Sequence, residues 1–448
     1  LRSSLPDYMI PMVIMFLPAM PLTANGKVDR YGLPEPEQGR HSERMYVAPR
    51  TVTEEILAGL WSEVLKRDSV GVRDNFFDLG GHSLLATQVM SRLRQAFRVE
   101  LPLRTLFDAP SIAQLAEVVD AARTLGSFDQ FPTVLPVPRT GPVPLSFAQQ
   151  RLWVLAQLDP DSPAYNIPIA LRVLGPLDMA ALQQSFDEVG RRHEVLRTTF
   201  KVNDGEPVQV IAPSLSIPLP IVDLQHVLEQ DRQAAADRLA AAEAQRPFDL
   251  HYGPMLRVNA LRLSPVEHVL LLTVHHIVSD AWSAHVLVRE VTALYGAFVE
   301  QRPSPLTDLP IQYADFSQWQ RTWLSGPVLD RELAYWKQIL SGDLPLLSLP
   351  TDHARRAVQQ SPGAALTVVF PQVLSEALTV LSRREGVTLF MLLLTAFDVL
   401  LNRYTGMEDL LVGTPIANRN RKEIEGLIGF FVNTIVLRVD VSGNPTFR

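Results

Sequence analysis

A glycine- and proline-rich stretch between residues 124 and 143 divides the chain into two parts with different hydrophobic patterns. Before it, apolar residues recur at helical spacing; after it, helical segments alternate with short apolar runs. Prolines stiffen such a stretch, so we interpret residues 122–141 as a linker between domains. A chain of 448 residues is also too long for one ordinary domain.

The part before the linker has the pattern of a small helical domain. Apolar residues from Ile56 to Leu65 fall on one face of a first helix, and a loop then leads to a second amphipathic helix. The later helices are predicted at Ser83–Phe97, Leu103–Phe107 and Ser111–Ala121. We therefore predict a four-helix bundle within residues 45–121.

The part after the linker is predicted to mix helices and strands. Val269–Val274 is a continuous apolar run, which indicates a strand buried on both faces. Leu389–Leu401 is too short to cross a bilayer and contains Asp398, so we expect a buried core helix there. Further helices are predicted at Met179–Phe200, Trp282–Val299 and Thr388–Tyr404, with strands at Leu410–Thr414 and Thr434–Val441. The predicted fold class of this part is α/β or α+β, with more than one sheet layer.

Composition narrows the classes of function. The chain has no cysteine, which excludes disulfides and thiolate metal sites. Its net charge is -7 and no block of Lys or Arg stands out, so we expect no nucleic-acid partner. No secretory signal and no membrane span are visible, and together with the lack of cysteine this predicts a cytoplasmic protein.

Ser83 is the first candidate site residue. It follows Gly80 and Gly81, which allow a tight turn and leave room for a bulky adduct, and it lies in the first turn of a predicted helix. Backbone N–H groups at a helix start favour an anion such as a phosphate. For an isolated serine after glycine, a plain helix cap is the simpler interpretation.

His275, His276 and Asp280 form the second candidate site. They follow the predicted buried strand directly, where a strand end opens onto a loop. The two histidines point to opposite sides of the strand, so only one can face a given cavity. Asp280 is close enough to brace the loop. A structural histidine pair beside a capping aspartate is the alternative, and no third ligand is placed for a metal site.

The segment DNFFDLGGHSLLATQ from Asp74 to Gln88 resembles the thiolation, or peptidyl carrier, domain signature of non-ribosomal peptide synthetases. The resemblance covers about residues 48–120. It implies that Ser83 carries 4'-phosphopantetheine, attached by a phosphopantetheinyl transferase from coenzyme A. The arm would supply the thiol that this chain lacks.

The segment HHIVSDAWS at residues 275–283 resembles the core motif of condensation domains, which share a chloramphenicol-acetyltransferase-like fold. Other segments match the motifs of that family in the same order: SFAQQRLW at 146–153, RHEVLRTTF at 192–200, YADFSQW at 313–319 and IGFFVNT at 428–434. The resemblance implies that His276 is the functional histidine, that His275 is mainly structural and that Asp280 braces the loop. Arg197 is the expected partner of Asp280.

The resemblance also has departures and extensions. Ala281 stands where the family usually has glycine, and its methyl group is expected to narrow the channel or restrict the loop. The last motifs of the family are absent, so residues 142–448 are interpreted as an incomplete condensation domain. Residues 1–40 resemble the end of an adenylation domain, whose adenylate-contacting lysine would be Lys27. We expect the chain to be cut from a longer polypeptide, with an adenylation domain upstream and another carrier downstream.

The implied function is non-ribosomal peptide synthesis, of the kind that makes antibiotics or siderophores. The carrier would hold an aminoacyl or peptidyl thioester, and the condensation domain, an acyltransferase, would join it to the amine on a downstream carrier. The SFAQQRLW segment resembles the subtype that joins an L-donor to an L-acceptor. The histidine pair argues against a heterocyclisation domain, and the residues after Asp280 differ from those of epimerisation domains. A non-catalytic docking fragment stays open as an alternative.

Overall fold

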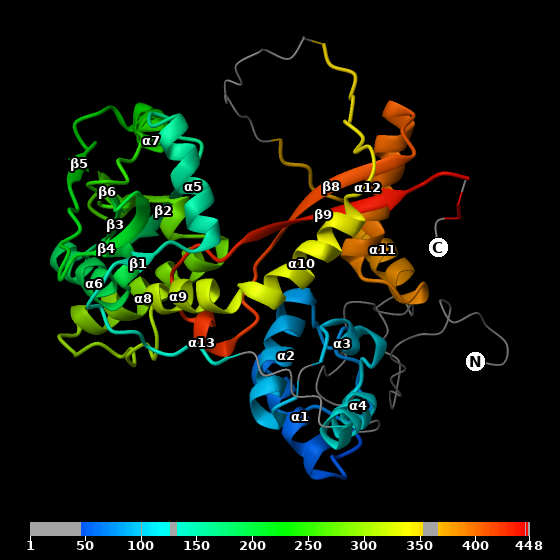
Figure 1. The fold of residues 1–448 in the computed structure, drawn as a ribbon. Coiled ribbons are helices and arrows are strands. Elements are labelled where there is room, and N and C mark those ends of the chain that lie inside the picture. The colour runs from blue at the N-terminus through cyan, green and yellow to red at the C-terminus, as the bar shows by residue number, and fades with distance from the viewer. Residues whose placement is uncertain (1–45, 100, 126–131, 353–365, 444, 447–448) are drawn as a thin grey trace, which may run out of the picture. The chain divides into compact units, whose positions relative to one another are not determined.

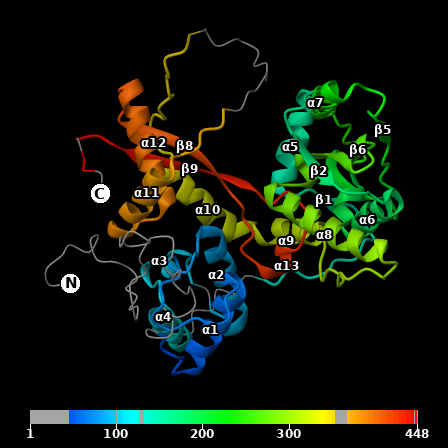
Figure 2. The same ribbon diagram turned by 180° about the vertical axis from the view of Figure 1, so that it is seen from behind.

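The computed structural model describes residues 46–99, 101–125, 132–352, 366–443 and 445–446. The chain divides into two compact units, residues 1–129 and 130–448. Figure 1 and Figure 2 show their labelled elements from opposite sides. The adenylation tail expected at residues 1–40, with Lys27, lies outside the described residues.

Helices build the described part of the first unit. They are α1 (Val52–Leu65), α2 (Ser83–Phe97), α3 (Arg104–Asp108) and α4 (Ile112–Leu125). α1 begins where the Thr51 side chain accepts a hydrogen bond from the Glu54 backbone N–H at 3.1 Å. The fully buried rings of Trp61 and Phe76 meet edge to face at 5.0 Å. Phe76 belongs to the loop before α2, so this contact fixes that loop on the helical core.

A four-stranded sheet lies at the centre of the second unit. Its order is β2 (Asn166–Leu174), β7 (Glu267–His275), β6 (Leu256–Ser264) and β5 (Ile221–Asp223). β7 lies between β2 and β6 and runs antiparallel to both. The strand predicted at Val269–Val274 is therefore confirmed, and it takes a central place in the sheet.

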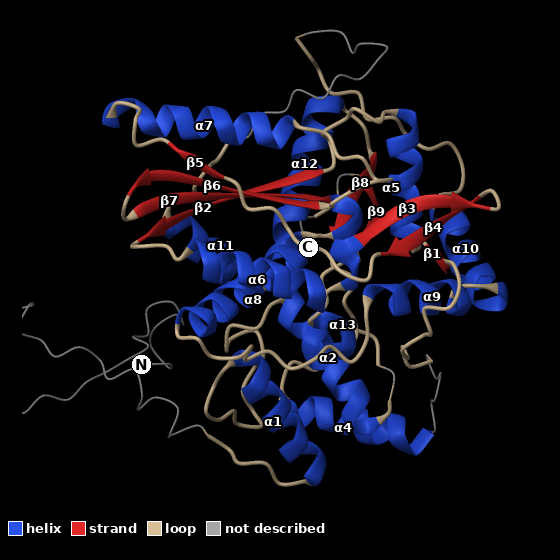
Figure 3. Ribbon diagram, turned by 90° about the vertical axis from the view of Figure 1, so that its left-hand side faces the viewer, coloured by secondary structure: helices blue, strands red, loops and turns tan. Residues whose placement is uncertain are grey.

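Helices cover both faces of this sheet (Figure 3). α7 (Glu229–Gln245) lies on one face, where Leu271 joins a small core with Ala235 and Ala236. α6 (Met179–Arg192) and α8 (Ala281–Val299) lie on the other, where Leu270 and Leu272 join the main core. Successive side chains of β7 alternate between the two faces, so the strand is buried on both sides. Its carboxyl end leads straight into the histidine pair.

The remaining elements form two further sheets and their connections. They are β1 (Val143–Pro144), α5 (Phe147–Leu158), η2 (Glu194–Arg197), β3 (Thr198–Asn203), β4 (Glu206–Ile211), η3 (His276–Val278), α9 (Tyr313–Trp323), α10 (Gly326–Ile339), α11 (Gln372–Arg384), α12 (Leu389–Thr405), β8 (Asp409–Ile416), α13 (Lys422–Glu425) and β9 (Asn433–Asp440). The second sheet has the order β1–β4–β3, and β8 pairs antiparallel with β9.

The helix predicted over Met179–Phe200 is too long. α6 ends at Arg192, a short 3-10 turn follows, and Thr198 begins β3. β3 pairs with β4 through a hairpin whose turn, Asp204-Gly205, has positive φ at both residues (50° and 82°). An Asp-Gly turn of this kind is a strong hairpin signal, and cross-strand pairing overrides the helical spacing before it.

α12 also departs from the prediction of a buried core helix. Only Leu392, Asp398 and Leu401 are buried in it, whereas Phe390 and Leu400 are 53% and 50% exposed. Within the described ranges, α11 and β8 are the main elements that pack on α12, so the other sides of this apolar helix stay open. No helix in the described part of the chain is long and apolar enough to span a membrane.

Candidate functional site

His276 lies at the point where the central strand ends. Its backbone N–H donates to the Tyr165 carbonyl at 2.8 Å, and its Nδ1 lies 2.8 Å from the Ser279 carbonyl oxygen. A carbonyl can only accept, so Nδ1 is the protonated nitrogen in this contact, and Nε2 is the nitrogen left to exchange a proton or a hydrogen bond with another group. Between residues 270 and 280, all of them described, His276 alone is partly exposed. The site therefore presents one imidazole nitrogen with acid–base capacity at a fixed position.

His275 has a different environment from its neighbour. Its side chain is 5% exposed and packs edge to face on Phe248 at 5.7 Å. Nδ1 accepts a hydrogen bond from the Ile277 backbone N–H at 3.1 Å. Burial, with a smaller contribution from the nearby Arg257 guanidinium, lowers the pKa of His275 to about 4. His275 is thus a neutral imidazole that shapes the turn after β7.

Asp280 pairs with Arg419, so the prediction that Arg197 is its partner is wrong. Arg419 Nη2 lies 3.1 Å from Asp280 Oδ1 and 3.4 Å from Oδ2, and both residues are fully buried. Arg197 instead donates to the Ala212 carbonyl and lies 3.8 Å from Glu194. Burial lowers the pKa of Arg419, while the carboxylate beside it acts in the opposite direction. A guanidinium nonetheless stays charged in proteins, so this is a buried ion pair.

Asp280 also begins α8. Its Oδ1 accepts from the Ser283 backbone N–H at 2.8 Å, which is the geometry of a helix cap. The Ser283 hydroxyl lies 2.8 Å from the same oxygen. Ala281 follows the cap as an exposed residue, so its methyl group does not enter the buried network.

The same network fixes residues 419–431, which we call the anchored segment. Arg419 Nη1 donates to the carbonyls of Ile424 and Leu427, each at 2.7 Å. The Phe431 backbone N–H donates to Asp280 Oδ2 at 3.1 Å. Asp280 lies 139 positions before Arg419 and 151 before Phe431, so its contacts tie the segment to the loop that carries His276.

A second buried group holds the anchored segment from α6. His193 Nδ1 accepts from the Ile428 backbone N–H at 3.3 Å, and its Nε2 lies 2.8 Å from Glu290. Arg192 Nε lies 3.0 Å from the same carboxylate oxygen. Desolvation lowers the pKa of His193, which keeps Nδ1 free to accept.

Ser83, in the other unit, is the first residue of α2. The residue before it, His82, has extended backbone, and among the described residues no side chain caps this helix and no carboxylate lies in its first turn. Gly80 has φ 98°, and a Cβ added at Gly81 would come within 2.4 Å of the Phe76 ring. A helix start with open backbone N–H groups fits the phosphate of a phosphopantetheine ester.

No metal site accompanies these residues. In the described ranges, no three His, Cys, Asp or Glu side chains are arranged to hold an ion. A cavity of about 480 Å³ lies between α5, β3 and residues 247–251. Its lining includes Trp153 and Phe248 but not His276.

Comparison with protein families gives matches for both units. The condensation domain family matches residues 140–448, and the phosphopantetheine attachment site family matches residues 55–119. One of the linear gramicidin synthase proteins from Brevibacillus parabrevis is 52% identical over 448 residues, all of this chain but 9% of that protein. Malpibaldin synthetase from Mortierella alpina is 44% identical over 450 residues, again covering the whole chain and 8% of the relative. The chain thus spans less than a tenth of these relatives' lengths.

Solved structures resemble about two thirds of this chain or slightly more. The X-domain from teicoplanin biosynthesis has a TM-score of 0.64 and 30% identity, covering 70% of this chain and 69% of that one. The first condensation domain of the calcium-dependent antibiotic synthetase, in complex with a substrate analogue, has a TM-score of 0.60 and 22% identity, covering 69% and 72%. The second likeness concerns the fold alone.

We expect His275 to make folding stability depend on pH. Between the ordinary histidine pKa of about 6.5 and the folded value of about 4, the unfolded chain binds a proton that the folded chain does not. The contribution is complete above about pH 6.5, and about 3 kcal/mol is lost as pH falls to about 4. Urea unfolding followed by tryptophan fluorescence measures this loss. His275→Gln should reduce the slope of this pH dependence, part of which remains because burial also lowers the pKa of His193 and His268. The exposed-site control His226→Gln should leave the slope unchanged. Parallel curves for wild type and His275→Gln would contradict the assignment.

Asp280→Ala should destabilise the second unit strongly, because it leaves Arg419 buried without its counter-charge. The expected loss is roughly 3–5 kcal/mol in the free energy of unfolding, measured by urea titration. Adding Arg419→Met should recover part of the loss. Asp409→Ala, which breaks the partly exposed pair with Arg438 at 2.7 Å, is the control and should change stability little. Similar small losses from both aspartate variants would argue against a structural role of the buried pair.

Proposed function

The chain belongs to the condensation domain family of non-ribosomal peptide synthetases and also contains a phosphopantetheine attachment domain, and we therefore propose that it forms amide bonds between carrier-bound substrates. The donor would be an aminoacyl or peptidyl group held on Ser83. The acceptor would be the amine of an aminoacyl group on a downstream carrier. When bound, the phosphopantetheine supplies a thiol that holds the acyl group as a thioester.

The contact of His276 Nδ1 with the Ser279 carbonyl oxygen is the observation that carries this proposal, because it leaves Nε2 as the free nitrogen of the ring. The ring is oriented by the Nδ1 contact to Ser279, and the loop is braced by the buried Asp280–Arg419 pair. An α-amine has a pKa of about 8, so an appreciable fraction is already neutral near pH 7 and no strong base is needed. Nε2 can accept a hydrogen bond from the amine and so align it with the acyl carbonyl.

The proposed step exchanges one bond of the acyl carbon for another. The amine nitrogen forms a bond to the acyl carbon, and the carbon–sulfur bond breaks. The nitrogen loses one proton and the departing sulfur gains one, with His276 able to take the first and deliver the second. Stabilisation of the tetrahedral species by the same imidazole contributes in addition.

The proposal that Ser83 is the attachment residue rests on its position in the fold. It begins a fifteen-residue helix whose start has no acidic residue and no side-chain cap within the described residues. A phosphate ester there meets backbone N–H groups and the positive end of the helix dipole. A phosphopantetheinyl transferase using coenzyme A is the partner that this role requires.

Finer features are proposed from sequence resemblance. We infer a preference for L-configured donor and acceptor from the SFAQQRLW segment at residues 146–153. Residues 1–40 are proposed as the end of an adenylation domain with Lys27 as its adenylate-contacting remnant, which makes an upstream adenylation domain a further partner. The likeness to chloramphenicol acetyltransferase and the cytoplasmic location stay predictions.

Treatment of the protein with a phosphopantetheinyl transferase and coenzyme A should add the mass of one phosphopantetheine. Ser83→Ala should abolish the gain, because the ester has no oxygen to form on. Ser91→Ala, a buried serine in the same helix, should load normally. Intact-protein mass spectrometry measures both, and loading of Ser83→Ala would move the attachment site elsewhere.

His276→Ala, tested in the intact synthetase that contains this chain, should lower the rate of amide formation by about a hundredfold to ten-thousandfold. Ser83 loading should be unchanged, since the two sites lie in different units. His285→Ala, an exposed histidine on α8, is the matched control. Carrier-bound product is measured by mass spectrometry after rapid quenching, and a wild-type rate in His276→Ala would refute the proposal.

A further inference from the structure

The ring of Phe430 is the aromatic neighbour of His276. The two rings meet edge to face with their centroids 4.6 Å apart, and Phe430 is 3% exposed. The Nδ1 contact to Ser279 fixes one edge of the imidazole. The Phe430 ring limits rotation of the imidazole away from that contact, because a rotated ring would collide with it. The position of Phe430 is therefore part of what orients Nε2.

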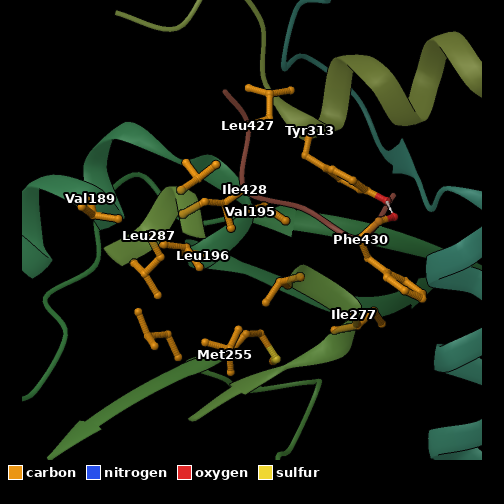
Figure 4. Packing of buried hydrophobic residues seen from close by; sticks show 14 of the residues in the cluster. Val189, Val195, Leu196, Met255, Ile277, Leu287, Tyr313, Leu427, Ile428 and Phe430 are labelled. Atoms are coloured by element: carbon orange, nitrogen blue, oxygen red, sulfur yellow. Dashed lines mark hydrogen bonds between the residues drawn. The ribbon is translucent and has the colours of Figure 1, made fainter. Parts of the chain in front are cut away.

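The backbone on both sides of Phe430 is held by the network of Asp280. The Gly429 N–H donates to the Ser283 hydroxyl at 3.0 Å, and the Phe431 N–H donates to Asp280 Oδ2 at 3.1 Å. The carbonyl of Phe430 itself has a different partner. The Tyr313 hydroxyl donates to it at 2.6 Å, as Figure 4 shows.

Tyr313, the first residue of α9, is buried beside Gly429 and Phe431. Its side chain is 1% exposed, and its ring packs edge to face on Phe431 at 4.9 Å. A Cβ added at Gly429 would come within 2.0 Å of the Tyr313 ring, so glycine is required for the close approach. The hydroxyl also lies 2.8 Å from Ser146 Oγ, which caps α5. Burial raises the pKa of Tyr313, so its hydroxyl keeps the proton that it donates.

We propose that Tyr313 is a positioning residue for condensation: its hydroxyl holds the Phe430 carbonyl, and the Phe430 ring thereby keeps the His276 imidazole aimed at the acceptor amine. The inference rests on the proposed role of His276. It adds a contact on Phe430 itself to those that the Asp280 network makes on either side of it, and it links this place to the start of α5 through Ser146.

Tyr313→Phe tests this link, because it removes the hydroxyl and keeps the ring against Gly429 and Phe431. In the intact synthetase, kcat for amide formation should fall roughly ten- to hundredfold, with KM for the acceptor little changed, because alignment is lost and binding is not. Tyr295→Phe is the matched control: its hydroxyl also binds a backbone group, the Asp178 N–H at 3.0 Å, on the same unit. The control should keep wild-type kcat.

A spectroscopic readout separates positioning from simple loss of stability. With 15N-labelled histidine, the His276 signals, assigned by their loss in His276→Ala, should show one Nδ1–H tautomer in the wild type and a mixture in Tyr313→Phe. A folded Tyr313→Phe protein with wild-type kcat and a single tautomer would overturn the inference. A Tyr313→Phe protein that differs from the wild type only in a lower urea midpoint would also overturn the inference.

Phe430→Leu provides a second test should Tyr313→Phe fail to fold. It retains the backbone carbonyl that Tyr313 binds and removes only the ring beside His276. The same loss of kcat and the same mixed tautomers are expected, and their absence overturns the inference. Failure of the proposed function is distinguishable, since it requires His276→Ala to retain amide formation, whereas failure of this inference leaves His276→Ala inactive and Tyr313→Phe active.

Discussion

The buried pair of Asp280 and Arg419 is the interaction on which the rest of the condensation site depends. The Asp280 carboxylate caps α8, neutralises the Arg419 guanidinium and accepts a hydrogen bond from the Phe431 backbone N–H. The guanidinium in turn binds two carbonyls of the anchored segment. A buried charge is tolerated only when most of its hydrogen-bonding capacity is used. Both terminal nitrogens of Arg419 have acceptors, and among the described residues only its Nε lacks a partner. The loop with His276 therefore lies between the end of β7 on one side and this network, at Asp280, on the other.

Local patterns predicted the parts of the site that lie on a single element. The apolar run Val269–Val274 indicated the central strand, and alternation along a strand separated the environments of His275 and His276. The glycines before Ser83 likewise indicated a tight turn into a helix. Each of these inferences needs only a few consecutive residues, so the sequence carries them directly.

Such local patterns could not predict contacts between residues that lie far apart in the sequence. Arg419 lies 139 positions from Asp280, and nothing in its local sequence distinguishes it from Arg197 as a partner. The boundary of α6 was missed because the Asp204-Gly205 turn pairs β3 with β4, which outweighs helical spacing. The burial of α12 depends on how many elements pack around it, and a hydrophobic run in the sequence does not reveal how many do so.

The anchored segment has a mechanical consequence for the hairpin that flanks it. β8 ends at Ile416 and β9 begins at Asn433, so only a few residues separate each strand from the anchored segment between them. One of these connections contains Asn418, whose backbone has a left-handed φ of 52°. A displacement of β8 and β9 would therefore reach the loop of His276 through the anchored segment, which joins the two strands and is bonded to Asp280.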